Sequence, residues 1–228
     1  MVESSDKTSK IAALNKKMQE SSNCCQLAET RTNIVPGEGD PEAQVLFIGE
    51  GPGQKEDEQG RPFIGQAGQL LSQLLEEIGL SREKIFIANV LKCRPPNNRD
   101  PLPEEVTACW PWLRQQIEII NPVLIVLLGR FAMERFLPGM KISNVRGKVL
   151  RRNIPDIGMK VFMPTYHPAA VLYHRQWLDF LREDFKKIPR VLDLLASGND
   201  LNQDKNDPTE WDSIEIGVKK QHEQGKLL

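Results

Sequence analysis

One stretch of this chain is more informative about the fold than any other: Val45-Leu46-Phe47-Ile48-Gly49-Glu50-Gly51-Pro52-Gly53. Its first four residues are apolar without interruption, which is typical of a strand buried on both faces of a sheet. The glycines that follow allow a turn whose backbone approaches a ligand closely, because glycine has no side chain. The turn is not a phosphate-binding P-loop, since no Gly-Lys-Ser/Thr follows it, and its glycine spacing is not that of a dinucleotide-binding motif.

Apolar runs and amphipathic patterns alternate along the rest of the chain. We expect three more strands, at residues 85–88, 123–128 and 160–163. We expect helices at residues 11–20, 66–78, 103–120 and 177–195, and another that begins at residue 129. Strands that alternate with helices predict an α/β fold in which a parallel sheet is covered on both faces.

The length of 228 residues fits one domain with short extensions. Residues 1–10 are polar, and we expect them to be flexible. The domain itself is expected to span residues 11–197. Residues 198–228 are again mostly polar and are expected to form a disordered tail, with a short partner-binding segment around Trp211 as the alternative.

The formal net charge of −1 excludes a strongly basic nucleic-acid binder, so any such binding must use a local patch. Residues 130–152 are rich in Arg and Lys and are one candidate; the alternative is an ordinary solvated surface. The longest apolar run, residues 123–128, is far shorter than the roughly 20 residues that a membrane helix needs. The first residues do not resemble a signal peptide, so we expect a cytoplasmic protein, nucleoid-associated if it binds DNA.

The four cysteines form two pairs along the sequence, Cys24 with Cys25 and Cys93 with Cys109. Four cysteines without a secretion signal do not predict a disulfide scaffold. Four thiolates gathered by the fold predict a metal or iron–sulfur site. Taken alone, Cys93 and Cys109 could also be core residues.

Three polar or glycine-rich loops follow the ends of predicted strands, starting at Gly49, Asn89 and His167. In parallel sheets, binding sites gather at the carboxyl ends of strands. The Asn89 carboxamide offers a donor and an acceptor side by side, which matches one edge of a pyrimidine; it could instead cap a turn. His167 is placed to stabilise a developing oxyanion. Phe63 stands in a polar loop, either as a stacking platform for a base, worth about 1–3 kcal/mol, or as a cap on the core.

Four motifs together are specific to one family. They are Gly49-Glu50-Gly51-Pro52-Gly53 with Glu56-Asp57, then Gly60-Arg61-Pro62-Phe63-Ile64-Gly65, then Asn89-Val90-Leu91-Lys92-Cys93-Arg94-Pro95-Pro96, then Pro164-Thr165-Tyr166-His167-Pro168. From about Ile11 to Leu195 the chain resembles the family 4 uracil-DNA glycosylases, the iron–sulfur branch of the uracil-DNA glycosylase superfamily.

The resemblance implies a three-layer α/β/α sandwich on a four-stranded parallel sheet. It implies hydrolysis of the N-glycosidic bond between uracil and deoxyribose in DNA, the first step of base excision repair. It implies a structural [4Fe–4S] cluster held by Cys24, Cys25, Cys93 and Cys109. The partner would be uracil-containing DNA, single- or double-stranded, bound by a monomer.

The resemblance also implies roles for single residues. Phe63 would stack on the extruded uracil, Asn89 would read its polar edge, and His167 would donate to the uracil oxygen that gains charge. Glu56 would lie near the pyrimidine C5 edge and help to exclude the methyl group of thymine. The loop after His167 would insert an apolar wedge, from Val171 or Leu172, into the DNA; the alternative is that both residues pack onto the core.

DNA phosphates would meet His174, Arg175 and the basic residues of 146–152. Gly51 stands where the best-known branch of the superfamily has an aspartate. Catalysis would therefore rest mainly on stabilising the departing base, with water held by the Gly51 backbone, Glu50 or Glu56.

The family's first two cluster ligands are usually Cys-x-x-Cys. Here Cys25 fits the second position, but the first falls on Ser22. Either Cys24 is the first ligand, or a group other than a cysteine completes the set.

Three other functions compete with this interpretation. A related branch forms a covalent adduct through a histidine in a basic loop, but residues 146–152 contain no histidine. A DNA-binding module without enzyme activity would not need Phe63, Asn89 and His167 intact. A redox protein would be expected to carry a flavin or second-cluster signature, which we do not find.

Overall fold

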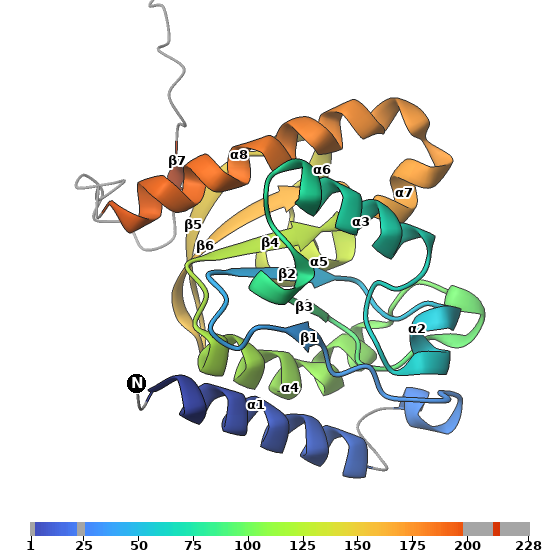
Figure 1. Ribbon diagram of the computed structural model, residues 1–228. Coiled ribbons are helices and arrows are strands. Elements are labelled where there is room, and N and C mark those ends of the chain that lie inside the picture. The colour runs from blue at the N-terminus through green and yellow to red at the C-terminus, as the bar shows by residue number, and fades with distance from the viewer. Residues whose placement is uncertain (1–2, 22–25, 198–211, 215–228) are drawn as a thin grey trace, which may run out of the picture.

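The computed structural model describes residues 3–21, 26–197 and 212–214, the first three and last three of these by their backbone only. In these ranges one sheet of seven strands forms the centre of the molecule, in the order β1-β3-β2-β4-β6-β5-β7 (Figure 1). The strands are β1 (Glu38–Gly39), β2 (Val45–Gly49), β3 (Phe86–Asn89), β4 (Leu124–Leu128), β5 (Val149–Ile154), β6 (Gly158–Thr165) and β7 (Asp212–Ile214).

The four predicted strands are the parallel centre of this sheet, β3-β2-β4-β6. The expected four-stranded parallel sheet is nevertheless too small, because antiparallel strands extend it at both edges. β1 pairs with β3, β5 with β6, and β7 with β5. These edge strands are short or polar, so they lack the continuous apolar run that marks a strand buried on both faces.

Helices cover both faces of the sheet. They are α1 (Glu3–Glu20), α2 (Gln54–Gln59), α3 (Gln66–Glu77), α4 (Pro103–Ile120), α5 (Gly129–Phe136), α6 (Ile142–Val145), α7 (Pro168–Tyr173) and α8 (Leu178–Ala196). Helices α1, α4 and α5 pack on one face of the sheet, and α3, α7 and α8 pack on the other (Figure 1). The predicted α/β class with three layers is confirmed.

Strand β2 shows why the layers form. Its side chains alternate between the two cores: Leu46 and Ile48 join the α1, α4 and α5 side, while Val45 and Phe47 join the α3 and α8 side. All five residues of β2 are buried. Successive side chains of a strand point to opposite faces, so an uninterrupted apolar run is what a doubly covered strand requires.

Several expected boundaries differ from the structure. Helix α1 begins at Glu3, so the expected flexible segment 1–10 is helical from residue 3 onward. Helix α2 was not among the predicted helices, because its six residues are all polar and show no apolar periodicity. Within the expected disordered tail, Asp212–Ile214 form β7, whereas Trp211 lies outside the described residues. None of the described helices is long and apolar enough to cross a membrane.

Candidate active site

A cavity of about 360 Å³ opens at the carboxyl end of the parallel sheet. Six residues that the sequence singled out line it: Glu50, Gly51, Glu56, Phe63, Asn89 and His167. Strands β2, β3 and β6 end beside it, as expected for a parallel sheet. The cavity walls also include residues that sequence reasoning did not single out, among them Asn98, Arg99 and Tyr173.

Gly49, the last residue of β2, makes room for two of these side chains. A Cβ atom at Gly49 would lie 2.5 Å from Asn89 Oδ1 and 2.6 Å from Phe63 Cζ. Real Cβ atoms do not approach other heavy atoms this closely. Gly49 and Asn89 are also register partners in the β2–β3 pair. The first glycine of the motif therefore lets the aromatic ring and the carboxamide approach the strand end together.

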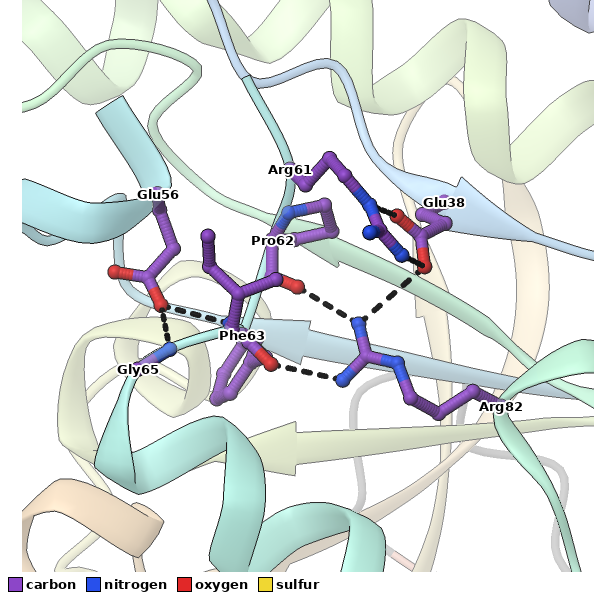
Figure 2. Close-up of polar contacts among 8 residues, drawn as sticks. Glu38, Glu56, Arg61, Pro62, Phe63, Gly65 and Arg82 are labelled. Carbon is purple, nitrogen blue, oxygen red and sulfur yellow. Dashed lines mark hydrogen bonds and ion pairs between the residues drawn. The ribbon is translucent and has the colours of Figure 1, made fainter. Parts of the chain in front are cut away.

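Glu56 fixes the loop that carries Phe63. Its Oε1 accepts hydrogen bonds from the amide nitrogens of Ile64 at 2.8 Å and Gly65 at 2.7 Å (Figure 2). Gly65 is the N-cap of α3, where a negative charge also meets the positive end of the helix dipole. Phe63 has a φ of 53°, in the left-handed region that side chains other than glycine rarely adopt. Glu56 therefore lines the cavity and also holds a strained backbone segment in place.

Arg82 holds the same loop from the other side. Its guanidinium donates to the carbonyl oxygens of Phe63 and Pro62, both at 2.8 Å (Figure 2). Glu38 accepts from Arg61 and lies 3.6 Å from Arg82, which completes the cluster. Sequence reasoning missed Arg82 and Glu38, because neither stands in a motif or near the cavity residues in the chain.

Asn89 is buried, with 2% of its surface exposed. Among the described residues nothing hydrogen-bonds its Oδ1. A buried acceptor without a partner is costly, and such groups in native proteins usually serve a ligand or water. The Asn89 amide oxygen is thus available to a donor that enters the cavity.

His167 is a neutral hydrogen-bond donor in this environment. It is the N-cap of α7, and its Nδ1 accepts from the amide nitrogen of Ala169 at 3.1 Å. Burial lowers the pKa of His167 to about 4, an effect that the nearby Glu56 carboxylate opposes. The ring proton of the neutral imidazole is therefore on Nε2. The ring centroid lies 5.5 Å from that of Phe63, at an interplanar angle of 32°.

Glu50 is a carboxyl group of the cavity whose pKa is strongly raised. Burial raises its pKa to about 7; the negative charge of Asp100 adds to this shift and Arg130 opposes it. A carboxylate with a pKa near the working pH can bind and deprotonate water.

The second cysteine pair lies in a separate buried cluster. Cys93 and Cys109 pack there with Leu14, Met18, Leu27, Ile34 and Leu91. Arg31 donates to Cys93 Sγ at 3.0 Å, and the amide nitrogen of Lys92 lies 3.5 Å from Cys109 Sγ. Cationic and amide donors around sulfur suit thiolate ligands, whose charge they stabilise.

Cys24, Cys25 and Ser22 lie outside the described residues. The chain on both sides of them converges on Cys93: the Ser21 carbonyl accepts from Arg31 at 2.9 Å, and Leu27 belongs to the same buried cluster. Among the described residues, no group of three or more His, Cys, Asp or Glu side chains could hold a metal ion. The residues present fit a centre completed from residues 22–25, which the structure does not describe.

The predicted wedge residues differ from each other in exposure. Val171 is buried in the core beneath α7, whereas Leu172 is exposed. Next to them Tyr173 is 86% exposed and lines the cavity. His174 is exposed and packs against Trp177 in a tilted arrangement, with ring centroids 4.4 Å apart. Tyr173 could have been identified from the sequence by two signals: its side chain is aromatic, and it follows the His167 motif closely.

The basic stretch 146–152 is partly engaged inside the molecule. Arg146 donates to the buried carboxylate of Asp184 at 2.9 Å, and Arg152 donates to the carbonyl of Phe136. Lys148 is exposed. Part of the stretch that suggested DNA binding therefore stabilises the fold around β5 and α8.

The chain is similar in sequence to known proteins. Residues 36–192 match the model of the uracil DNA glycosylase superfamily. A type-4 uracil-DNA glycosylase of Sulfurisphaera tokodaii is 46% identical, over 83% of this chain and 92% of that protein. Those of Archaeoglobus fulgidus and Thermotoga maritima are both 51% identical; they match 72% and 66% of this chain and 84% and 78% of their own lengths.

The fold, the cavity at the carboxyl end of the sheet and the family match define the class of protein: the chain belongs to the uracil-DNA glycosylase superfamily. Within that superfamily, its similarity to the three relatives places it in the type-4 uracil-DNA glycosylase family. The family resemblance found in the sequence motifs is confirmed.

Proposed function

We propose that this chain is a DNA N-glycosylase that hydrolyses the bond between uracil and deoxyribose and so starts base excision repair. The observation that carries the proposal is the buried Asn89 Oδ1, which has no partner among the described residues and lies in the same cavity as Phe63 and His167. Family membership supports the same activity.

Recognition follows from the chemistry of the uracil edge. Uracil carries a donor at N3, which suits the Asn89 amide oxygen, while cytosine has an acceptor at that position. Phe63 offers a ring face for stacking, worth about 1–3 kcal/mol. The base must leave the DNA stack to enter the cavity.

Bond cleavage leaves its electron pair on the base. As the bond from uracil N1 to C1′ breaks, negative charge spreads to the uracil oxygens, and His167 Nε2–H donates a hydrogen bond to one of them. A neutral donor suits this role, because it stabilises the anion without transferring a proton to it. The oxygen of a water molecule bonds to C1′ of the sugar.

Glu50 is the group in this proposal that accepts the proton of that water. Its raised pKa makes it a stronger base than an ordinary carboxylate. Glu56 is less suited, because its Oε1 already accepts two amide hydrogen bonds. Gly51 contributes only backbone; a Cβ there would lie 3.3 Å from the Cβ of Leu91, which is a tight contact. Independently of this step, the proposal includes that Glu56 helps to exclude the methyl group of thymine.

The cofactor in this proposal is a [4Fe–4S] cluster held by Cys93, Cys109, Cys25 and either Cys24 or the Ser22 position. When bound, it supplies a structural cross-link between distant segments. The buried Cys93 and Cys109 sulfurs and their donors support this assignment. The substrate is uracil-containing DNA; a monomer associated with the nucleoid is part of the same proposal.

The first experiment is direct. Purified protein is incubated with an oligonucleotide that contains one uracil, then treated with alkali, and strand cleavage is measured against a thymine control. Cleavage at uracil alone supports the proposal. Binding without cleavage would favour a DNA-binding module instead, and a heat-stable protein–DNA adduct would favour the covalent branch. Single- and double-stranded substrates are compared in the same assay.

A further inference from the structure

Lys92 is a fully buried lysine that is hydrogen-bonded to Asn89, a residue of the cavity wall. Its side chain has 0% exposure, and it is among the largest fully buried side chains. Its Nζ donates to the main-chain carbonyl oxygen of Asn89 at 2.9 Å and to Gln116 Oε1 at 2.7 Å. Gln116, in α4, is itself fixed by a bond from Nε2 to the carbonyl of Pro36 at 2.8 Å. Lys92 therefore connects the end of β3 to a helix on one face of the sheet.

A lysine is rarely buried, because removal of the ammonium group from water costs several kcal/mol unless it is well paired. An apolar side chain would fill this space without that cost. The polar group at this position therefore points to a need for its hydrogen bonds. One of the two goes to the residue whose side chain carries the unsatisfied acceptor.

The position of the Asn89 carboxamide depends strongly on how the main chain of Asn89 is held. The side-chain Oδ1 makes no hydrogen bond to any described residue, so within the described part of the chain no partner of this oxygen restrains the carboxamide. Asn89 is the last residue of β3. Its carbonyl lies beyond the strand and is held by Lys92, which fixes the peptide group immediately after the Asn89 Cα.

We propose that Lys92 is a positioning residue for uracil recognition: its bond to the Asn89 carbonyl sets the direction in which the Asn89 carboxamide enters the cavity. The inference rests on the proposed function, since it assigns the role through Asn89. In this role Lys92 differs from an ordinary core residue, because Lys92 affects the rate only through the Asn89 side chain.

A double-mutant cycle tests this dependence. The first-order rate of uracil release under single-turnover conditions is measured for the wild type, Lys92→Met, Asn89→Ala and the double variant. Methionine keeps the approximate volume and removes the donor. We expect Lys92→Met to lower the rate about 10-fold in the wild-type background and less than about 2-fold when Asn89 is already alanine. The exposed Lys84→Met is the matched control and should leave the rate unchanged.

An equal loss in both backgrounds would overturn the inference, since Lys92 would then act on the fold and not through Asn89. Inhibition by free uracil is a second readout: Lys92→Met should weaken it, while affinity for DNA without uracil stays the same. If Lys92→Met does not fold, the same cycle with Lys92→Leu, which also removes the donor, measures the same coupling. Absence of uracil release by the wild type would instead reject the proposed function itself.

Discussion

At the scale of single residues, His167 and Asn89 should each carry a large part of the rate. Each supplies one preorganised polar group to the uracil, and loss of such a group costs roughly 10²–10³ in rate. We expect His167→Ala and Asn89→Ala to lower the single-turnover rate of uracil release by about that factor. The exposed Asn153→Ala is the control and should react at the wild-type rate. Unchanged rates in either cavity variant would reject the assigned roles.

Glu50 should give the reaction a pH dependence. Its pKa is raised to about 7, so the carboxylate form increases as pH rises through that value. If the carboxylate accepts the proton of water, kcat/KM should rise about tenfold per pH unit below about 7 and level off above it. His167, with a pKa of about 4, stays neutral above about pH 5 and therefore adds no second pH-dependent step to the profile.

The pH–rate profile is measured between about pH 5 and 9 for the wild type and for Glu50→Gln. The variant should be slower and should lose the rise with pH. A variant with the same profile as the wild type would show that another group titrates.

The sequence could predict which polar residues near strand ends form the site, but it could not predict which residues hold them in place. Asn89 directly follows one apolar run and His167 comes shortly after another, so the rule for parallel sheets places them at one edge. Arg82 reaches the Phe63 loop only through the tertiary fold, from a segment with no motif of its own. The second role of Glu56, as an acceptor for backbone amides, likewise depends on a fold that its spacing does not reveal.

At the scale of elements, the loop between α2 and α3 should be the most sensitive to loss of the Glu56 carboxylate. Glu56→Ala removes the oxygen that accepts both amide hydrogen bonds and leaves the strained Phe63 backbone without that restraint. We expect a loss of about 1–3 kcal/mol in the free energy of unfolding and a rate at least about 10-fold lower. Glu56→Gln keeps an acceptor oxygen and should lose less on both counts.

Thermal unfolding and single-turnover rates of both variants check this expectation. The exposed Glu58→Ala, in the same helix α2, is the matched control. If alanine and glutamine variants were equally slow, the charge of Glu56 would act on the substrate and not on the loop.

The strands and helices that the sequence predicted are those with strong periodic signals. Helix α4 has the expected bounds, residues 103–120, and the four parallel strands lie within a few residues of their predicted positions. Strand β5 was not predicted, because the polar residues Arg151, Arg152 and Asn153 interrupt its apolar pattern. Strand β1 has only two residues, too few for any periodic pattern.

At the scale of the whole molecule, the two halves of the cysteine set come from distant segments. Cys93 follows β3 and Cys109 lies in α4, while residues 22–25 join α1 to the short 3₁₀ helix η1 (Gln26–Glu29). A cluster bound by both pairs would cross-link these elements on the side of the molecule where α1 packs against α4. The sequence could predict the ligand type, but the pairing of distant segments needed the fold.

Anaerobically purified protein should therefore contain about four iron and four sulfide ions per chain. Cys93→Ala and Cys109→Ala should each lose iron and unfold at a lower temperature, because each variant loses the cross-link together with one buried sulfur contact. Iron and sulfide analysis with thermal unfolding measures both effects. Protein that contains no iron in any preparation would reject the cluster.

The same measurement decides which residue completes the cluster. If Cys24 is the first ligand, Cys24→Ala should lose iron and Ser22→Ala should keep it. If the Ser22 position is the ligand, Ser22→Ala should lose iron and Cys24→Ala should keep it. Ser22→Cys restores the usual Cys-x-x-Cys spacing with Cys25. This variant should hold iron in the Cys24→Ala background whichever residue serves in the wild type, because a thiolate at that spacing suits the cluster. Loss of iron in that double variant would show that the segment around residues 22–25 follows a path different from that of its relatives.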